Sequence, residues 1–191
     1  MNIPSLIDQY IEALRNAGVK SPFADWAQFD AATDDDLDAL EAACGCSLQA
    51  GLGPWLRHVT CALPFQGNYT AVSISSILER IESTKTIDFS KHLANIHSWN
   101  DGRFENNKIE KTYWQPQWIG VARDGCGNEY CVDLAPGPGG EIGQILAMEF
   151  QDGQGPYLGQ WPNLEGMLQA HIARLEGGDF TLDEEGFIEF E

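Results

Sequence analysis

Several residues in this 191-residue chain could carry chemistry, and a glycine-rich loop is the first of them. The loop runs from Gly137 to Gly143 and resembles a phosphate-binding loop, in which backbone N–H groups surround an anion at the start of a helix. However, a strand-like segment follows it, Glu141 stands inside it, and no Lys-Ser or Lys-Thr pair ends it. The sequence therefore argues against a phosphate site.

Asp133 and the histidines are the next candidates. A carboxylate such as Asp133 can act as a general base, but before a turn at Pro136 it can equally accept backbone N–H groups. The histidines are scattered, and none stands beside Ser or Cys in a recognised nucleophile motif. They are His58, His92, His97 and His171. We expect no activity that depends on Asp133, His97 or Cys131, and an enzyme is the least favoured class of function.

The five cysteines point away from a metal site. They are Cys44, Cys46, Cys61, Cys126 and Cys131. Their number is odd, whereas secreted chains usually pair their thiols. The paired Cys-x-x-Cys spacing of structural zinc sites is absent, so small buried side chains are the expected role. The sequence predicts no metal and no cofactor.

The secondary structure expected to position these residues lies mainly in residues 114–145, WQPQWIGVARDGCGNEYCVDLAPGPGGEIGQI. Strand-like segments alternate there with Gly-rich turns, in which Gly accepts positive φ and Asp or Asn bonds its own backbone. The pattern predicts an antiparallel β-meander over residues 117–122, 129–134 and 143–149. The residues expected to shape its turns are Gly125, Gly127, Asp133, Pro136, Gly140 and Gly143.

Helical patterns surround the meander. Apolar residues recur at helical spacing from Pro4 to Ala17, and Thr33 is placed to cap a second helix that ends at Gly45. Further expected elements are a short helix from residue 51, a strand at 68–73, a helical turn or short helix at 76–81, and a helix from Pro162 to Leu175. Residues 19–32, 84–112 and 151–160 read as connecting loops. This arrangement predicts a single α+β (α/β) domain over residues 1–191, with helices packed on the meander.

The run around the meander resembles the SUKH superfamily. The matching positions are Trp114-x-Pro116, Ile119, Val121, Asp124-Gly125-x-Gly127-Asn128, Tyr130, Asp133-Leu134-x-Pro136 and Gly140-x-x-Gly143-Gln144-Ile145. The resemblance extends to residues 33–45 and 161–175, although the family's Leu-Pro is Leu48-Gln49 here. The superfamily includes fungal cell-wall-assembly regulators of the Smi/Knr type, bacterial Syd and many bacterial immunity proteins. The resemblance implies either an immunity protein that neutralises a toxin, most plausibly a nuclease, or a regulatory scaffold.

The net charge of the chain indicates which class of binding partner is favoured. The chain has 29 acids and 11 bases, a formal net charge of −18, and residues 124–191 contain 14 acids and Arg174 as their only base. Nucleic acid binding needs Lys and Arg to replace counterions, and an anionic membrane would repel such a chain. A basic protein would be attracted and would meet it faster. The alternative is that the charge serves only solubility.

A basic protein partner, such as a cognate toxin, is therefore expected, with no small-molecule substrate. An acidic surface near the meander would bind it through four carboxylates, with two tryptophans as possible anchors. These residues are Asp124, Glu129, Glu141, Glu149, Trp114 and Trp118. For both tryptophans a place in the core is the favoured alternative. No apolar run of about 18 residues and no basic start of a signal peptide occur, which predicts a cytoplasmic protein. The acidic tail, residues 179–191, would pair as two short strands or lie loose.

Overall fold

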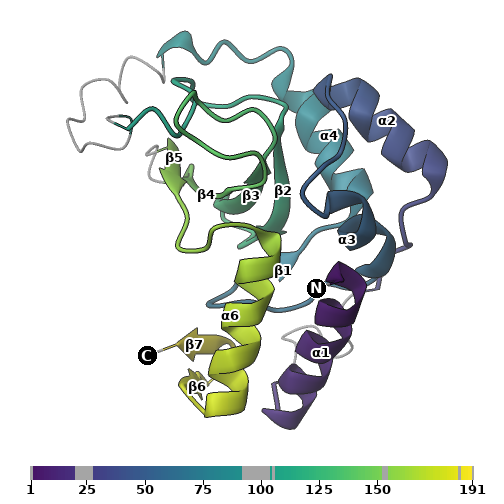
Figure 1. The fold of residues 1–191 in the computed structure, drawn as a ribbon, viewed down its shortest axis with the longest axis vertical. Coiled ribbons are helices and arrows are strands. Elements are labelled where there is room, and N and C mark those ends of the chain that lie inside the picture. Colours follow the sequence, from purple (N-terminus) through teal and green to yellow (C-terminus); the bar gives the residue numbers. More distant parts are fainter. Residues whose placement is uncertain are drawn as a thin grey trace.

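The computed structural model describes residues 2–19, 28–91, 104, 106–151, 155–184 and 186–190. Figure 1 labels its helices and strands along the chain. The helices are α1 (Ile3–Asn16), α2 (Asp34–Cys44), α3 (Leu52–His58), α4 (Ile74–Thr84) and α6 (Leu164–Gly177). The strands are β1 (Thr70–Ala71), β2 (Trp118–Arg123), β3 (Glu129–Asp133), β4 (Ile145–Glu149), β5 (Gly155–Leu158), β6 (Phe180–Leu182) and β7 (Ile188–Phe190).

The predicted meander is confirmed as the centre of a five-stranded antiparallel sheet in the order β1-β2-β3-β4-β5. Strand β1 was expected to be longer, and β5 lies where a loop was expected. The register between β2 and β3 shifts between Gly120 and Ala122, which is a β-bulge that leaves Val121 without a register partner in β3. An extra residue of this kind re-aims the side chains on either side of it.

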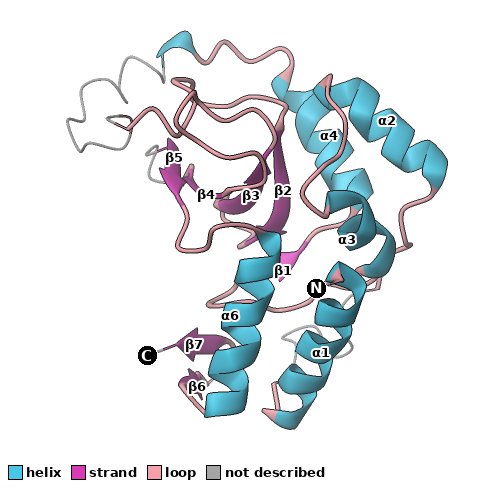
Figure 2. Cartoon of the chain, viewed as in Figure 1, coloured by secondary structure: helices cyan, strands magenta, loops and turns pink. Residues whose placement is uncertain are grey.

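Both faces of the sheet are covered. The larger core joins one face to the helices through residues such as Ile119, Val132 and Ile145. A smaller cluster buries Trp118, Cys131, Leu146 and Met148 with Ile109. Helices α1 and α6 contact each other, as do α2 and α4, and Figure 2 shows the first pair below the sheet and the second beside it. The α+β prediction is therefore confirmed.

Capping residues explain where the helices begin. The Thr33 side chain accepts from Asp36 N at the start of α2, and the Asp36 carboxylate accepts from Thr33 N at 2.9 Å, a reciprocal capping box. Helix α4 is longer than the predicted 76–81 because Ser73 caps it, accepting from Ser76 N. Asn163 does the same for α6, which begins at Leu164 rather than at Pro162.

The described part of the acidic tail forms an antiparallel pair, β6 and β7. The Ile188 side chain is fully buried, and its carbonyl accepts from Gly67 N at 2.7 Å. The tail is therefore anchored to the core, which favours the strand pair over a loose end. Three aromatic residues of the connector at 19–32 are expected from the sequence to cover the core. Phe29 does so, whereas Phe23 and Trp26 lie outside the described residues.

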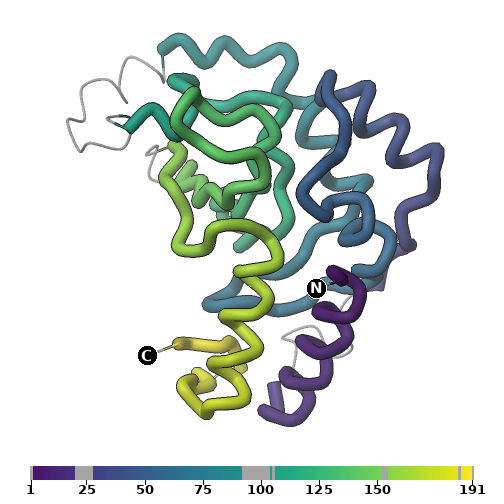
Figure 3. The backbone as a smooth tube through the Cα atoms, in the orientation of Figure 1, coloured from purple at the N-terminus to yellow at the C-terminus, as the bar shows by residue number. Residues whose placement is uncertain are grey.

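The Gly-rich loop after β3 packs its backbone directly against the segment around Lys108 (Figure 3). Gly137 N donates to Lys108 O at 3.1 Å, and Gly139 N donates to Asn107 O at 3.0 Å. A Cβ at Gly140 would overlap Lys108 O. Glycine is needed in this loop for close approach of two backbones, and not for an anion.

Three of the four predicted turn glycines have positive φ: Gly125 at 77°, Gly127 at 113° and Gly143 at 93°. Each turn thus contains at least one, as predicted. Gly140 is not among them, and the close approach to Lys108 accounts for it instead.

Replacing Gly143 with Ala should destabilise the protein by about 2 kcal/mol, because positive φ strains a side-chain-bearing residue and the added Cβ would overlap Ala50. The measurement is urea unfolding. Gly53→Ala is the matched control, since Gly53 lies inside α3 and a Cβ there meets nothing within 4 Å. That variant should unfold at the same urea concentration as the parent or a higher one. Equal midpoints for both variants would contradict the assignment.

Candidate functional site

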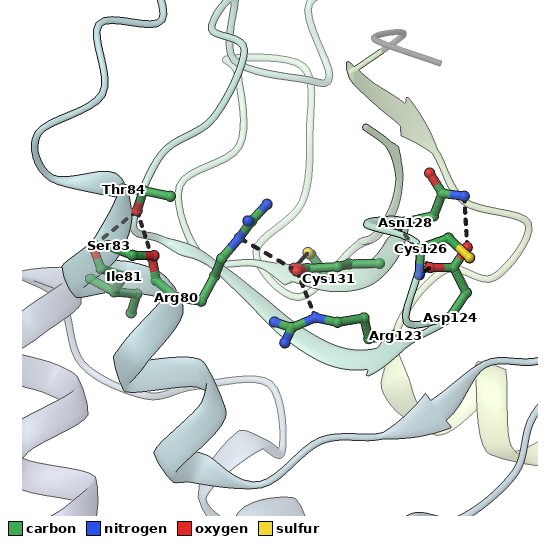
Figure 4. Close-up of polar contacts among 10 residues, drawn as sticks. Arg80, Ile81, Ser83, Thr84, Arg123, Asp124, Cys126, Asn128 and Cys131 are labelled. Atoms are coloured by element: carbon green, nitrogen blue, oxygen red, sulfur yellow. Dashed lines mark hydrogen bonds and ion pairs between the residues drawn. The ribbon is translucent and has the colours of Figure 1, made fainter. Parts of the chain in front are cut away.

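The β2–β3 turn is held by one carboxylate. Asp124 Oδ1 accepts from Cys126 N at 2.7 Å and from Asn128 N at 3.0 Å, and its Oδ2 accepts from Asn128 Nδ2 at 2.7 Å. Figure 4 shows Asp124, Cys126 and Asn128 closing this turn. Asn128 Oδ1 in turn accepts from Gln151 N at 3.1 Å. The side chains of the Asp-Gly-x-Gly-Asn motif therefore close the β2–β3 turn, and Asn128 also links this turn to the residue Gln151 that follows β4.

Beside the turn lies a cluster of three charged side chains, Arg80, Glu129 and Arg123. Glu129 is 3% exposed, and its Oε1 accepts from Arg123 Nε at 2.9 Å and lies 3.5 Å from Arg80 Nε. Figure 4 shows the two arginines approaching from α4 and β2. Arg80 also stacks on the Phe150 ring at 5.2 Å. A buried carboxylate of this kind needs such partners, since an uncompensated charge in the interior is costly.

The local sequence explains why the cluster forms. The bulge after Gly120 restores a register in which Arg123 lies directly opposite Glu129, and cross-strand neighbours of opposite charge attract. Gly120 leaves room for the carboxylate, because a Cβ there would lie 3.0 Å from Glu129 Oε2. Spacing around the turn could have indicated the Arg123–Glu129 pair. Arg80 is far away in sequence and gave no such signal.

A surface hollow of ≈ 420 Å³ is lined by the Gly-rich loop after β3, Lys108 and residues 158–162. Another, of ≈ 380 Å³, opens over the cluster. The second is lined by Ser76, Glu79, Arg80, Ser83, Arg123, Gly125, Gly127 and Glu129. Two arginines and two glutamates are among these lining residues, so their formal charges balance. Ser83 Oγ donates to Arg80 O at 3.0 Å, and no histidine lines the hollow. Among the described residues around it there is no nucleophile–base pair of the kind that acyl or phosphoryl transfer needs.

Asp133 holds the second turn. Its side chain is fully buried; Oδ1 accepts from Ala135 N at 3.0 Å and Oδ2 accepts from Gln144 Nε2 at 2.9 Å. Gln144 Nε2 also donates to Lys108 O at 2.9 Å. Burial raises the pKa of the Asp133 carboxyl, and the bonds from Gln144 and Ala135 oppose that rise. The turn role expected of Asp133 is confirmed: its carboxylate accepts a backbone N–H next to Pro136.

The structure corrects part of the predicted binding surface. Trp118 is 2% exposed and Trp114 is 9% exposed, because both rings fill the cores on the two faces of the sheet. Glu129 is drawn inward by its two arginines. None of these three side chains offers a surface to a partner.

The other carboxylates of the predicted surface differ in exposure. Glu141 is exposed, whereas Asp124 and Glu149 are half-buried. Because both Asp124 oxygens already accept bonds in the turn, Glu141 is the most available of the three.

The histidines and cysteines in the described part of the chain differ in burial and do not gather into a common site. His171 is 1% exposed, and His58 pairs with Asp8 at 2.8 Å near the surface. His92 and His97 lie outside the described residues. Burial, followed by the nearby Glu129, raises the pKa of the Cys131 thiol well above its usual range. No group of three or more His, Cys, Asp or Glu side chains suited to a metal occurs among the described residues.

In the described part of the chain, none of the helices is both long and apolar enough to cross a bilayer.

The family model for the SMI1 / KNR4 family (SUKH-1) matches residues 31–170. The chain belongs to this family. The SMI1/KNR4 match begins just before α2 and ends within α6, so it includes the whole five-stranded sheet, both turns and the Arg80–Glu129–Arg123 cluster. It leaves out α1 and the β6–β7 pair.

Fungal SMI1/KNR4 proteins are among the similar sequences. The chain is 30% identical over 103 residues to "KNR4/SMI1 homolog 2" of Debaryomyces hansenii, covering 54% of this chain and 17% of that protein. It is 35% identical over 77 residues to "Cell wall assembly regulator SMI1" of Saccharomyces cerevisiae, covering 40% and 14%. A match of 55% over 38 residues, 20% of this chain and 7% of the relative, is to "Glucan synthesis regulatory protein" of Neurospora crassa. The chain thus spans less than a fifth of these relatives.

Proposed function

We propose that this chain is a non-catalytic, protein-binding module that acts as a regulator or scaffold. The observation that carries the proposal is the SMI1/KNR4 match over residues 31–170, whose relatives include proteins named as cell-wall regulators. The bonding of the motif residues supports it. The polar side-chain atoms of four motif residues are engaged in hydrogen bonds that hold the turns, which argues against a catalytic role for them. These residues are Asp124, Asn128, Asp133 and Gln144.

The test is to capture partners from the native cell with the full chain as bait, beside a variant that keeps the fold and changes the surface. Glu141→Lys serves this purpose because Glu141 is exposed. A regulator or scaffold should retain one or more proteins in stoichiometric amounts. A turnover of small molecules by the purified chain, abolished by a change at Asp133 or Cys131 in a folded variant, would overturn the proposal.

A second candidate is the neutralisation of a basic toxin, such as a nuclease, by an immunity protein. The charge distribution favours it: residues 124–191 contain Arg174 as their only base. Besides Glu141, the exposed acids among the described residues of this stretch are Glu176, Asp179, Asp183, Glu184 and Glu189. A basic protein is attracted to such a surface over a distance of about one Debye length. A toxin gene beside the gene for this chain would support this candidate, and cell-wall synthesis genes there would support the first.

For either candidate with a basic partner, association should slow markedly between 0.01 M and 0.15 M salt, since the Debye length falls from about 30 Å to about 8 Å. Dissociation should change much less. Stopped-flow mixing with the captured partner measures both rates. An association rate that is indifferent to salt, or an acidic partner, would contradict the charge argument.

The contact surface can be separated from steering by charge reversal. Glu141→Lys with Glu149→Lys should speed dissociation if the partner sits near the meander, whereas reversal of Glu184 and Glu189 should lower only the association rate. Asp35→Lys is the control, since Asp35 is exposed at the start of α2, far from both groups in the sequence. Equal effects of all three changes would argue against a defined contact surface.

A further inference from the structure

Two thiols lie in contact at the end of α2, apart from the turns and the charged cluster. The Sγ atoms of Cys44 and Cys46 are 3.5 Å apart. Cys44 is 1% exposed, whereas Cys46 is only half-buried. Cys46 is therefore the more accessible residue of the pair to a small reagent in solution.

The backbone between them explains the contact. Gly45 caps α2 in the left-handed conformation, with φ 73° and ψ 21°, and its N–H donates to Glu41 O at 2.8 Å. This reversal brings the side chains of the residues on either side of Gly45 together. The Cys44 thiol donates to Cys46 O at 3.3 Å. Glycine fits this conformation without a steric penalty and keeps the short link adjustable.

We propose that Cys44 and Cys46 form a reversible intramolecular disulfide, which makes Cys44-Gly45-Cys46 an oxidation site of this protein. The oxidant is a low-molecular-weight disulfide such as glutathione disulfide. The Cys46 thiolate attacks it, the glutathione S–S bond breaks, and one glutathione thiolate leaves. The Cys44 thiolate then attacks Cys46 Sγ and expels the second glutathione. Two protein thiols are oxidised, one glutathione disulfide is reduced to two thiols, and the two protein protons pass to the leaving thiolates.

The geometry sets the character of this bond. A disulfide has its sulfurs about 2.0 Å apart, so the two Sγ atoms must move about 1.5 Å closer. A ring closed over only three residues departs from relaxed disulfide geometry, and such bonds are readily reduced. The site is therefore suited to reversible oxidation and not to permanent cross-linking.

The surroundings link the pair to the rest of the fold. Cys44 O accepts from Gln117 Nε2 at 2.7 Å, just before β2, and Glu41 Oε1 accepts from Leu48 N at 2.7 Å. Closing the ring fixes the end of α2 between these two bonds. Burial, followed by the adjacent Cys44 thiol, raises the pKa of Cys46 to about 12. Exchange at neutral pH is consequently slow, and its rate should rise about tenfold per pH unit below that pKa.

The test equilibrates the full chain with glutathione at mildly alkaline pH and a series of oxidised-to-reduced ratios until the products no longer change. It then unfolds the protein in denaturant, blocks the free thiols and maps peptides by mass spectrometry. In the parent, the peptide with residues 44–46 should lose the mass of two hydrogens and escape alkylation. Cys44→Ser should stop as a glutathione adduct on Cys46, because the second thiol is missing. Cys46→Ser should leave Cys44 unmodified. Cys126→Ser removes an exposed thiol and should change nothing.

The parent alone can overturn the proposal, whether or not the variants fold. It fails if Cys46 accumulates as a glutathione adduct, or if both thiols stay alkylatable at ratios that fully modify Cys126. The test requires no binding partner, so its outcome is independent of the proposed regulatory function.

Discussion

Replacing Glu129 with Ala should lower the free energy of unfolding by about 3 kcal/mol, among the largest effects of a single change in this chain. The change removes the carboxylate that Arg123 and Arg80 share and leaves two cations beside a cavity. Breaking a fully buried ion pair typically costs about 3–5 kcal/mol. The lower end applies because the Arg80 and Arg123 side chains are 34% and 27% exposed, so solvent can screen their charge.

Glu129→Gln separates charge from shape. It keeps the side-chain volume that packs against Gly120 but loses the negative charge. We therefore expect its free energy of unfolding to lie between that of the parent and that of the Ala variant. Glu141→Ala is the matched control, because Glu141 is exposed and surface changes usually stay within about 0.5 kcal/mol. Urea unfolding of the four proteins is the measurement. If Glu129→Ala and Glu141→Ala unfold alike, the cluster does not stabilise the fold.

The meander could be predicted from sequence because its signals are local. Gly125, Gly127 and Gly143 occupy positions that need positive φ, and Asp124 bonds the backbone within four residues. Such turn chemistry depends on near neighbours only. Thr33 and Asp36 form a capping box by the same local logic.

The charged cluster could not be predicted because it depends on a bulge and on a distant helix. Glu129 was interpreted as a surface acid, since a carboxylate near an exposed turn is usually solvated. The register shift after Gly120 and the approach of Arg80 from α4 bring it inside instead. Trp118 proves to be in the core and not an anchor for a partner, because Ile109 and its neighbours cover the second face of the sheet, and nothing local to Trp118 indicates that cover.

The contact between Cys44 and Cys46 also depends on one backbone detail. Sequence predicted that Gly45 would end α2, and the C-cap confirms it. The contact between the side chains on either side of Gly45 depends on the left-handed φ and ψ of this cap, which the sequence alone does not specify. Two residues interpreted as small buried side chains therefore prove to differ in exposure and to touch each other.

Acid should destabilise this protein partly through one buried histidine. His171 is enclosed by the rings of Tyr10, Phe65, Trp161 and Phe190, at centroid distances of 4.9–5.9 Å. Its Nδ1 bonds Met167 O at 2.7 Å, and its Nε2 has no partner among the described residues. Burial lowers the pKa of His171 to about 4 from 6.5, against the opposing effect of the Met167 carbonyl.

The sign follows from which state binds the proton. The folded protein keeps His171 neutral down to pH about 4, whereas the unfolded chain protonates it below pH 6.5. The stability linked to His171 is therefore complete above pH 6.5, falls as pH decreases to about 4, and is constant below that. The difference between the two pKa values corresponds to about 3 kcal/mol, at 1.36 kcal/mol per unit.

A comparison with His171→Leu isolates this contribution from the many carboxylates that also titrate. Leu removes the titrating ring and retains an apolar side chain among the aromatic residues. The stability of the parent relative to the variant should fall by about 3 kcal/mol between pH 7 and pH 4. An NMR titration of the parent provides the second measurement, in which the His171 ring should stay neutral until pH about 4. A ring that protonates near pH 6.5, or a stability difference that does not vary with pH, would show that the aromatic enclosure does not exclude the charged imidazole.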